Sequence, residues 1–341
     1  MKFGPVPVAD AVGHILGHNV ADASGRRALR KGKSLTAEDI ELLRSLGRES
    51  VYVARLELGD VDEDSAAEQI ATALAGAGLR LSAARTGRVN VYSEEIGVLR
   101  VNIARLEEIN VGPGIALATL RNHSAVRPGR MVATLKVVPF ALERELVERV
   151  VAAAAANGPT LSVERIEPAR VGIILSGSAA AEERVTQGYL GALGPRFEEL
   201  GASIDCVDYV PLDDEADEAR LVQTLERGFE QALDLILLAG ETAIQDRHDI
   251  APRAIERAGG EITCYGAPVD PGNLLLLAFK GETAILGAPG CARSPKANII
   301  DLVLPRLLVG ERLDAASITA LGHGGLLEDV PERPVPRSRA G

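Results

Sequence analysis

The chain has 341 residues, of which 46% are hydrophobic, 25% are charged and only 3% are aromatic, with no tryptophan. This is globular composition with room for two or three domains, and the cores must consist of Val, Ile, Leu and Ala, as in helix-covered parallel sheets. The formal net charge of −11 argues against nucleic-acid binding, which relies on a surplus of cations. A phosphorylated ligand is not excluded, because backbone N–H groups at a helix start bind anions.

Cysteine usage and the N-terminus indicate a cytoplasmic protein. The three cysteines, Cys206, Cys264 and Cys291, lie far apart without a CxxC pair, which suggests neither a disulfide framework nor a zinc site. The N-terminus lacks the charged start and following apolar run of a signal peptide. No stretch is as long as the ~20 apolar residues that a membrane span needs. We therefore expect no membrane partner.

The first 157 residues predict a mixed α+β region. Helices are expected over 8–20, 35–46, 62–78 and 141–156, and strands in VYVARL, RVNVYS, GVLRVN, ALATL and MVATLKVVPF. Thr36 is the expected cap of the second helix, with Asp39 in the capping-box position. Asn157-Gly158-Pro159 closes the last helix and marks the expected end of this region.

Residues 165–312 alternate between apolar strands and helices. Strands are expected over 171–177, 203–210, 234–240, 261–266, 274–279 and 283–289, and helices over 179–200, 215–232, 250–259 and 294–308. This alternation predicts a three-layer α/β/α domain with a mainly parallel sheet. Residues 324–341 are rich in proline and charge and are expected to be an extended or disordered tail.

Ligands of open parallel sheets lie beyond the carboxyl ends of the strands. The first such loop is Ser176-Gly177-Ser178, whose glycine and hydroxyls suit an anion but are equally those of an ordinary strand-to-helix turn. The second contains Gly240, Thr242, Asp246 and Asp249. Asp249 is either the cap of the following helix or a magnesium ligand against a phosphate.

The third loop, GAPGCARSPKAN, begins with the turn Pro289-Gly290. Ser294 is the expected cap of the following helix, with Pro295 in its first turn. Arg293 and Lys296 bring two cations to a helix start, where cations are unfavourable, so a bound anion is expected there. The chain lacks the GxxxxGK[ST] and GxGxxG motifs of nucleotide-binding folds.

At these loops the sequence resembles the molybdopterin-binding proteins of molybdenum-cofactor biosynthesis. AGETAIQDRHDIAPRA looks like that family's TGGTGxxxRD loop and helix, and PGCARSPKA is similar to its last PG turn. VDPGNLLLLAF resembles the KPGKPLAFG segment, with Pro271 and Gly272 matched. RKGKSLTAEDIELLRSLG and VADAVGHILGHNV resemble N-terminal elements of the molybdotransferases.

The resemblance implies that the three loops bind molybdopterin or the molybdenum cofactor. The ligand phosphate is then expected at the 290–296 loop, with Thr242, Asp246 and Asp249 on the pterin end, a nucleotide or magnesium. Where the family has the second glycine of its GG pair, this chain has Glu241, and Asp270 and Asn273 replace the two lysines. Metal insertion and adenylyl transfer both handle dense negative charge, so the loss of two lysines and the gain of a carboxylate favour ligand binding over catalysis.

Three functions remain open at the level of sequence. The first is binding of the cofactor during its maturation or delivery. The second is a magnesium-dependent transferase that adenylylates molybdopterin or inserts molybdate, with Asp249 and Asp246 as candidate catalytic residues. The third is a non-catalytic assembly scaffold. The resemblance also implies a homo-oligomer, with a nucleotidyltransferase or a molybdoenzyme as partner on a separate chain.

Overall fold

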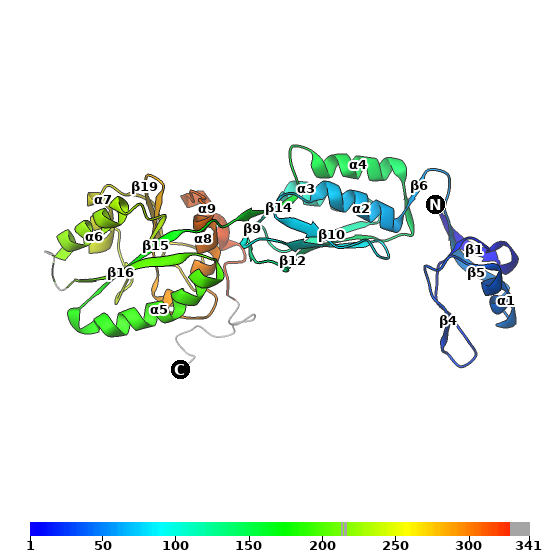
Figure 1. Ribbon diagram of the computed structural model, residues 1–341, viewed down its shortest axis with the longest axis horizontal. Helices are drawn as coiled ribbons and strands as arrows, with labels where there is room; N and C mark the ends of the chain where they lie inside the picture. Colours follow the sequence, from blue (N-terminus) through cyan, green and yellow to red (C-terminus); the bar gives the residue numbers. More distant parts are fainter. Residues whose placement is uncertain (213, 215–216, 328–341) are drawn as a thin grey trace. The chain divides into compact units, whose positions relative to one another are not determined.

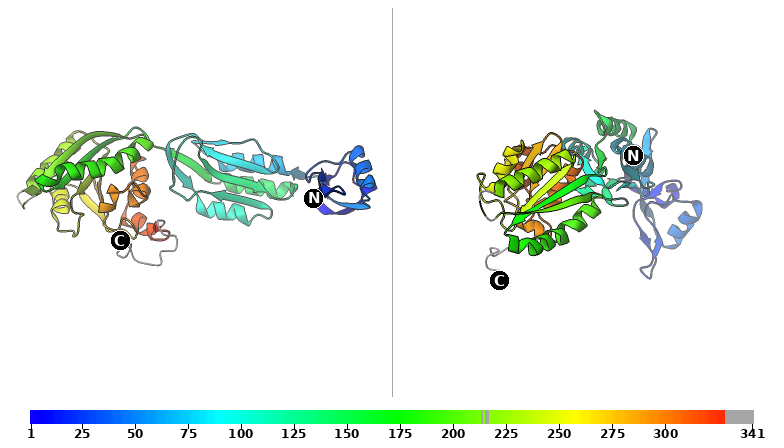
Figure 2. Two further views of the ribbon diagram at one scale, coloured as in Figure 1. Left: turned by 90° about the horizontal axis from the view of Figure 1, so that it is seen from below. Right: turned by 60° about the vertical axis from the view of Figure 1, so that its left-hand side comes forward.

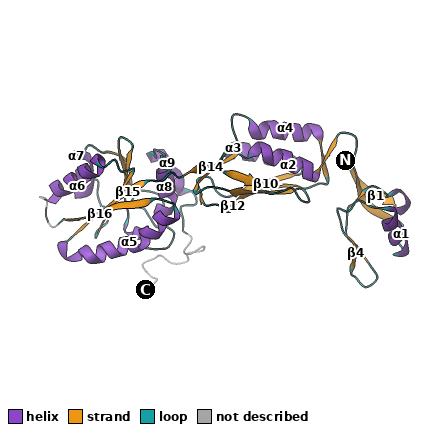
Figure 3. Ribbon diagram, viewed as in Figure 1, coloured by secondary structure: helices purple, strands orange, loops and turns teal. Residues whose placement is uncertain are grey.

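The computed structural model describes residues 1–212, 214 and 217–327. The chain divides into two compact units, of which the first comprises residues 1–95 and 99–164 and the second residues 96–98 and 165–341. The fold is mixed α/β with several sheets, as expected from the sequence (Figure 3). Within the described residues, no helix combines the length and apolarity that crossing a membrane requires.

The first unit begins with a small sheet in the order β1-β5-β2, beside the two-stranded sheet β3-β4. The elements of this segment are β1 Lys2–Pro7, the 3₁₀ helix Val8–Asp10, β2 Ile15–Leu16, β3 Val20–Ala21, β4 Arg27–Leu29, α1 Ala37–Ser45 and β5 Ser50–Arg55. The expected capping box of α1 is present, because the Thr36 hydroxyl accepts from the Asp39 N–H while the Asp39 carboxylate accepts from the Thr36 N–H.

The helix expected over 8–20 is wrong. Only Val8–Asp10 is helical, as one 3₁₀ turn, and Ile15–Leu16 pairs with β5 instead. Glycines at positions 13 and 17 interrupt the helical periodicity, and Gly13 has a positive φ of 80°. Pairing with a strand far along the chain therefore determines the local structure.

The remainder of the first unit contains a four-stranded sheet, β10-β12-β8-β7, and a three-stranded sheet, β11-β9-β14 (Figure 1). Its elements are β6 Asp60–Asp62, α2 Glu63–Leu74, β7 Leu79–Leu81, β8 Arg88–Ser93, β9 Gly97–Val101, α3 Ile103–Val111, β10 Ile115–Thr119, β11 Ala125–Val126, β12 Met131–Val137, β13 Ala141–Glu143, α4 Arg144–Ala155 and β14 Leu161–Arg165. Helix α3 has no counterpart among the expected elements. Helix α4 starts three residues later than expected because Ala141–Glu143 pairs with β6.

The second unit is built on a six-stranded sheet in the order β16-β15-β17-β20-β19-β18. Its elements are β15 Arg170–Gly177, the 3₁₀ helix Ala179–Ala181, α5 Glu182–Glu199, β16 Ser203–Pro211, α6 Glu218–Glu230, β17 Leu235–Gly240, α7 Ile250–Arg257, β18 Glu261–Tyr265, β19 Leu276–Lys280, β20 Thr283–Gly287, the 3₁₀ helix Gly290–Arg293, α8 Ile299–Leu308, α9 Ala315–Thr319 and the 3₁₀ helix Ala320–Gly322. Strands β16, β15, β17 and β20 run parallel to one another. Strand β19 is antiparallel to both of its neighbours, β20 and β18.

Alternate residues of the central strands belong to two different cores. Ile173 and Leu237 pack in one cluster with residues of α5 and α8, whereas Ile174 and Ile236 pack in another with residues of α6 and α7. Helices therefore lie on both sides of the sheet (Figure 1 and Figure 2). A strand that is buried on both faces reads as a continuous apolar run, which is why these strands were recognisable in the sequence.

Near the end of the chain, the last long helix starts later than expected. Helix α8 begins at Ile299 with Asn298 as its cap, so the expected start at Ser294-Pro295 is wrong. The expected tail over 324–341 lies outside the described residues from 328 onward, as do residues 215–216 of the helix expected over 215–232. Leu327 donates its N–H to the carbonyl of Asp270.

Candidate functional site

The strand order brings the three loops of interest to one edge of the sheet. Strand β15 pairs in parallel with β17, and β17 pairs in parallel with β20. The loops that follow these strands contain residues 176–178, 240–249 and 288–298. Because the carboxyl ends of neighbouring parallel strands coincide, the loops share the position at which such sheets hold ligands.

A cavity of about 320 Å³ opens at this edge. Its lining residues come from the ends of β15 and β17, the following loops, and single positions after β16 and β20: Ser176, Gly177, Ser178, Leu212, Leu238, Ala239, Gly240, Glu241, Thr242, Ala243, Ile244, Asp249, Ile250, Ala251 and Ala288. Seven of them were expected from the sequence, namely Ser176, Gly177, Ser178, Gly240, Glu241, Thr242 and Asp249. The volume falls in the lower part of the range of small-molecule sites, roughly 300–1,000 Å³.

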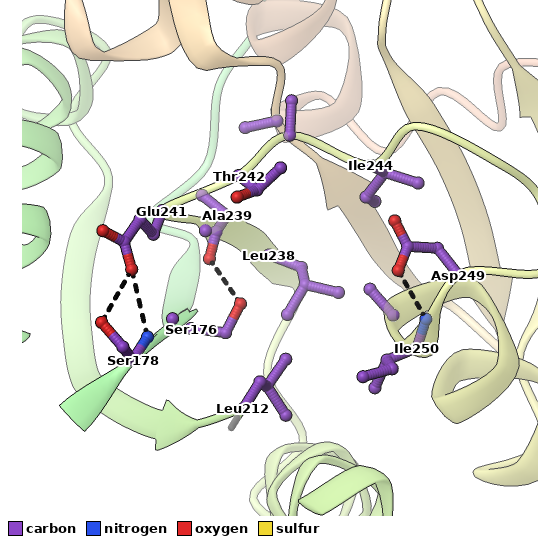
Figure 4. A pocket seen from close by; sticks show the side chains of 15 residues that line it. Ser176, Ser178, Leu212, Leu238, Ala239, Glu241, Thr242, Ile244, Asp249 and Ile250 are labelled. Carbon is purple, nitrogen blue, oxygen red and sulfur yellow. Dashed lines mark hydrogen bonds between the residues drawn. The ribbon is translucent and has the colours of Figure 1, made fainter. Parts of the chain in front are cut away.

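The cavity is polar at its two ends and apolar between them, as Figure 4 shows. Glu241 and Ser178 lie at one end, and Asp249 lies at the other, where helix α7 begins. Leu212 and Leu238 lie between the two ends. An apolar surface with a few placed polar groups is the usual lining of a site for a small organic ligand.

The Glu241 carboxylate is held by three donors from another part of the chain. Its Oε2 accepts the N–H of Ser178 at 3.1 Å and the Ser178 hydroxyl at 3.0 Å. Its Oε1 forms an ion pair with Arg184 of helix α5. The Ser178 N–H, followed by the Ser178 hydroxyl and Arg184, lowers the pKa of Glu241 below its ordinary value, so the carboxylate is charged at neutral pH.

At the other end, Asp249 is the cap of helix α7. Its Oδ1 accepts the N–H of Ile250 at 2.9 Å, and its Oδ2 accepts the N–H of Gln245 at 3.3 Å. The sequence left open whether this residue caps a helix or binds magnesium, and the cap is what the structure contains. The side chain also lines the cavity.

Binding of magnesium by Asp249 stays a prediction, because such an ion needs only one or two carboxylates beside a ligand phosphate. Asp246, the nearest expected carboxylate, is exposed and lies outside the cavity lining, with its Oδ1 facing the backbone N–H and Nδ1 of His248 at 2.8 and 3.0 Å. Those contacts lower its pKa, the backbone N–H of His248 first. Across the described part of the chain, no group of three His, Cys, Asp or Glu side chains could hold a metal ion.

The cations of the third loop lie outside the cavity lining. The Arg293 guanidinium lies 5.5 Å from the ring centroid of Tyr189, and the Tyr189 hydroxyl donates to the carbonyl of Gly240, which does line the cavity. The side chain of Tyr189, which belongs to helix α5, thus lies between Arg293 and the cavity. Lys296 is exposed, and its carbonyl accepts from Arg196.

The remaining residues expected at the site have structural contacts. Ser294 accepts the N–H of Lys296 on its hydroxyl rather than capping a helix. Pro289 precedes the 3₁₀ helix that Gly290 begins. Pro271 accepts the N–H of Ile299 on its carbonyl, and a Cβ on Gly272 would lie 2.4 Å from Ile299. The 271–272 segment therefore lies against the start of α8 rather than in the cavity.

Sequence reasoning missed Arg184, Tyr209 and Leu212. Leu212 lines the cavity after β16, a strand with no recognisable ligand loop, and the Tyr209 hydroxyl donates to the carbonyl of Ser178 at 2.7 Å. Arg184 could have been found, because it is a cation in the first turn of helix α5. The helix dipole disfavours a cation there, which indicates a nearby anion.

Fold and site together define a mixed α/β protein with a cavity at the carboxyl ends of the parallel strands of one sheet. A family model described as a domain of unknown function (DUF8806) matches residues 5–55. No curated protein matches the chain.

The solved structures that match include several molybdenum cofactor biosynthesis proteins. One from Pyrococcus furiosus is 13% identical with a TM-score of 0.25, and the match covers 91% of this chain and 64% of that one. The MoeA protein from Pyrococcus horikoshii is 12% identical with a TM-score of 0.28, over 91% and 74% of the two chains. The Mog protein from Mycobacterium ulcerans is 18% identical with a TM-score of 0.26, over 40% and 92%.

Proposed function

We propose that this protein binds molybdopterin or the molybdenum cofactor, in the biosynthesis, maturation or delivery of that cofactor. The observation that carries the proposal is the cavity at the carboxyl ends of β15 and β17, because it is lined by the loop after β17, whose sequence AGETAIQDRHDIAPRA resembles the molybdopterin-binding family. The finer fold assignment belongs to the same proposal: the second unit is a three-layer α/β/α domain, supported by the two clusters of apolar residues on opposite sides of its sheet.

The chemistry of the cavity supports a fused heteroaromatic ring as the ligand. Leu212 and Leu238 offer apolar surface to the faces of such a ring. Thr242 and Asp249 offer a hydroxyl and carboxylate oxygens to its polar edge, which carries both donors and acceptors. A pterin has this combination of a flat apolar face and a hydrogen-bonding edge.

The phosphate end of the ligand is proposed to lie toward Arg293 and Lys296. Both side chains are exposed, and Arg293 is connected to the cavity through Tyr189 and the Gly240 carbonyl. A guanidinium forms paired, charge-assisted hydrogen bonds with a phosphate. This arrangement would place the ring in the cavity and the anionic group beside helix α5.

The test is the retention of ligand by the full-length protein. Purified protein is incubated with molybdopterin, ATP, magnesium and molybdate and passed through gel filtration, and the retained ligand is identified by mass spectrometry. We expect unchanged pterin at about one equivalent per chain. Adenylylated or metal-loaded product would instead establish the transferase, and complete absence of pterin would overturn the proposed function and favour the scaffold.

A pair of threonine variants makes the test specific for the cavity. Thr242→Val keeps the side-chain shape and removes one hydroxyl, so we expect about fivefold to tenfold weaker pterin binding, the value of one hydrogen bond. Thr186→Val makes the same change on helix α5 outside the cavity lining, and it should bind like the unchanged protein. Equal binding by all three proteins would show that the ligand lies elsewhere.

A further inference from the structure

Glu241 fills one end of the candidate cavity with negative charge that belongs to the chain itself. Its carboxylate receives a backbone N–H, a hydroxyl and a guanidinium, from Ser178 and Arg184. These are the donors that proteins use for phosphates and carboxylates of ligands. The three donors are therefore already satisfied before any ligand arrives.

The local backbone is shaped around this carboxylate. The N–H of Glu241 donates to the carbonyl of Ser176 at 2.7 Å, which fixes the start of the side chain relative to β15. The backbone of Gly177 passes so close that a Cβ there would lie 2.7 Å from the Glu241 Cβ. The Tyr209 hydroxyl holds the carbonyl of Ser178 from the other side. Glu241 is 31% exposed and Ser178 is half-buried, whereas Arg184 is 63% exposed, so the two hydrogen bonds from Ser178 are better shielded from water than the ion pair.

We infer that Glu241 is a specificity-determining residue, which excludes any anionic group of a ligand from the Ser178–Arg184 end of the cavity. The inference rests on the proposed function in so far as the cavity is the ligand site. A ligand with one phosphate, placed toward Arg293, is compatible with this arrangement. A nucleotide form that needs a second anion position beside Ser178 would meet the Glu241 charge, to which the Ser178 N–H and hydroxyl already donate.

The experiment uses pyrophosphate as the probe and measures its binding to the full-length protein by titration calorimetry. Glu241→Ala releases the Ser178 N–H, the Ser178 hydroxyl and Arg184 together. We expect this variant to bind one more equivalent of pyrophosphate than the unchanged protein, or to bind it about tenfold more tightly. Glu241→Gln removes the charge while filling the same space, and should give a smaller gain. The double variant Glu241→Ala, Arg184→Ala should lose the gain.

Asp205→Ala is the matched control. Asp205 also pairs with an arginine, Arg170, and accepts from a serine hydroxyl, that of Ser203, but it lies toward the amino ends of the parallel strands. The substitution removes the same charge from the same unit and should add no pyrophosphate site. Circular dichroism of each variant checks that it is folded.

The outcomes separate this inference from the proposed function. A gain in Glu241→Ala that is absent in Asp205→Ala supports the inference, whether or not the unchanged protein retains molybdopterin. Equal pyrophosphate binding by the folded Glu241→Ala, Glu241→Gln and unchanged proteins overturns it, even if molybdopterin is retained. A similar gain in Asp205→Ala also overturns it, because the effect would then be one of net charge.

Discussion

Gly177 ends strand β15 in a backbone conformation that other residues rarely adopt, with φ at +154°. A side chain here would meet two neighbours at once, because a Cβ would lie 2.7 Å from the Cβ of Glu241 and 2.8 Å from the hydroxyl of Tyr209. Both neighbours are held by hydrogen bonds to Ser178. The glycine is thus required by conformation and by space, and the carboxylate can approach the loop only because it is there.

Gly177→Ala should accordingly destabilise the protein. The strained backbone alone costs about 1–3 kcal/mol, and displacement of Glu241 adds to it. Urea denaturation measures the free energy of unfolding. Gly191→Ala is the control, because Gly191 lies in helix α5 and a Cβ added there would have open space around it; this change should raise stability by roughly 0.5–1 kcal/mol. A Gly177→Ala variant as stable as the unchanged protein would contradict the tight fit described for this loop.

At the scale of the element, the start of helix α8 depends on Asn298 rather than Ser294. The Asn298 side chain accepts the N–H of Ile300, and its amide donates to the carbonyls of Cys291 and Lys296. Asp301 completes a capping box by accepting the N–H of Asn298. Asn298 is fully buried, so its bond to the N–H of Ile300 is shielded from water.

Replacing each of the two candidate caps should give different results. Asn298→Ala removes the cap of α8 and the amide that donates to the half-buried Cys291 carbonyl, so we expect a loss of about 2–4 kcal/mol in unfolding free energy. Ser294→Ala removes one exposed contact to the N–H of Lys296 and should cost below about 0.5 kcal/mol. Chemical denaturation of the two variants side by side measures the difference. If Ser294→Ala costs as much as Asn298→Ala, the cap has been assigned to the wrong residue.

These elements also show how far the sequence could predict the fold. The strands of the second unit were recognisable because burial on both faces makes them continuous apolar runs, as in LILLAG. The Ser294-Pro295 pair is a typical start of a helix, but α8 begins after Asn298 instead. The Asn298 side chain bonds both to Cys291 before it and to Ile300 after it, which stabilises the later start. The helix predicted over 8–20 was wrong for a similar reason, because Ile15–Leu16 pairs with β5 despite the helical spacing of the apolar residues. Contacts of this kind join residues that are apart in the sequence, so a local sequence pattern does not predict them.

The same reasoning applies to the site. Seven of the expected residues line the cavity because neighbouring parallel strands bring their loops together. Arg293 and Lys296 fall outside it because the 3₁₀ turn Gly290–Arg293 directs the chain toward helix α5. The partner of Glu241 could not be read from its neighbours in sequence, since Ser178 is 63 residues away.

At the scale of the whole molecule, all three cysteines lie in the second unit. Each is half-buried, so reaction of the thiols reports on that unit and not on the first. Residues 96–98 are counted with the same unit. The carbonyl of Ile96 accepts the N–H of Ile166, and its side chain packs against the core of the second unit.

Ile96→Ala should therefore shift thiol labelling in urea to lower denaturant concentration. Loss of a half-buried isoleucine side chain should cost about 1–2 kcal/mol, less than in a full core position. Ile103→Ala is the control, because Ile103 is 53% exposed on helix α3 of the first unit, and it should leave the labelling midpoint unchanged. If the two variants have the same urea midpoint of thiol labelling, Ile96 does not contribute to the core of the second unit.

The position of Ile96 also has a consequence for synthesis on the ribosome. The chain emerges from its amino end, and domains generally fold in the order in which they are made. Ile96 leaves the ribosome well before Ile166 and Gly201, the residues near its carbonyl and its side chain. Residues 96–98 therefore lack their final neighbours while residues 99–164 of the first unit are synthesised. The nascent chain thus has an interval in which a chaperone, or a second nascent chain, competes for the place that those two residues later take.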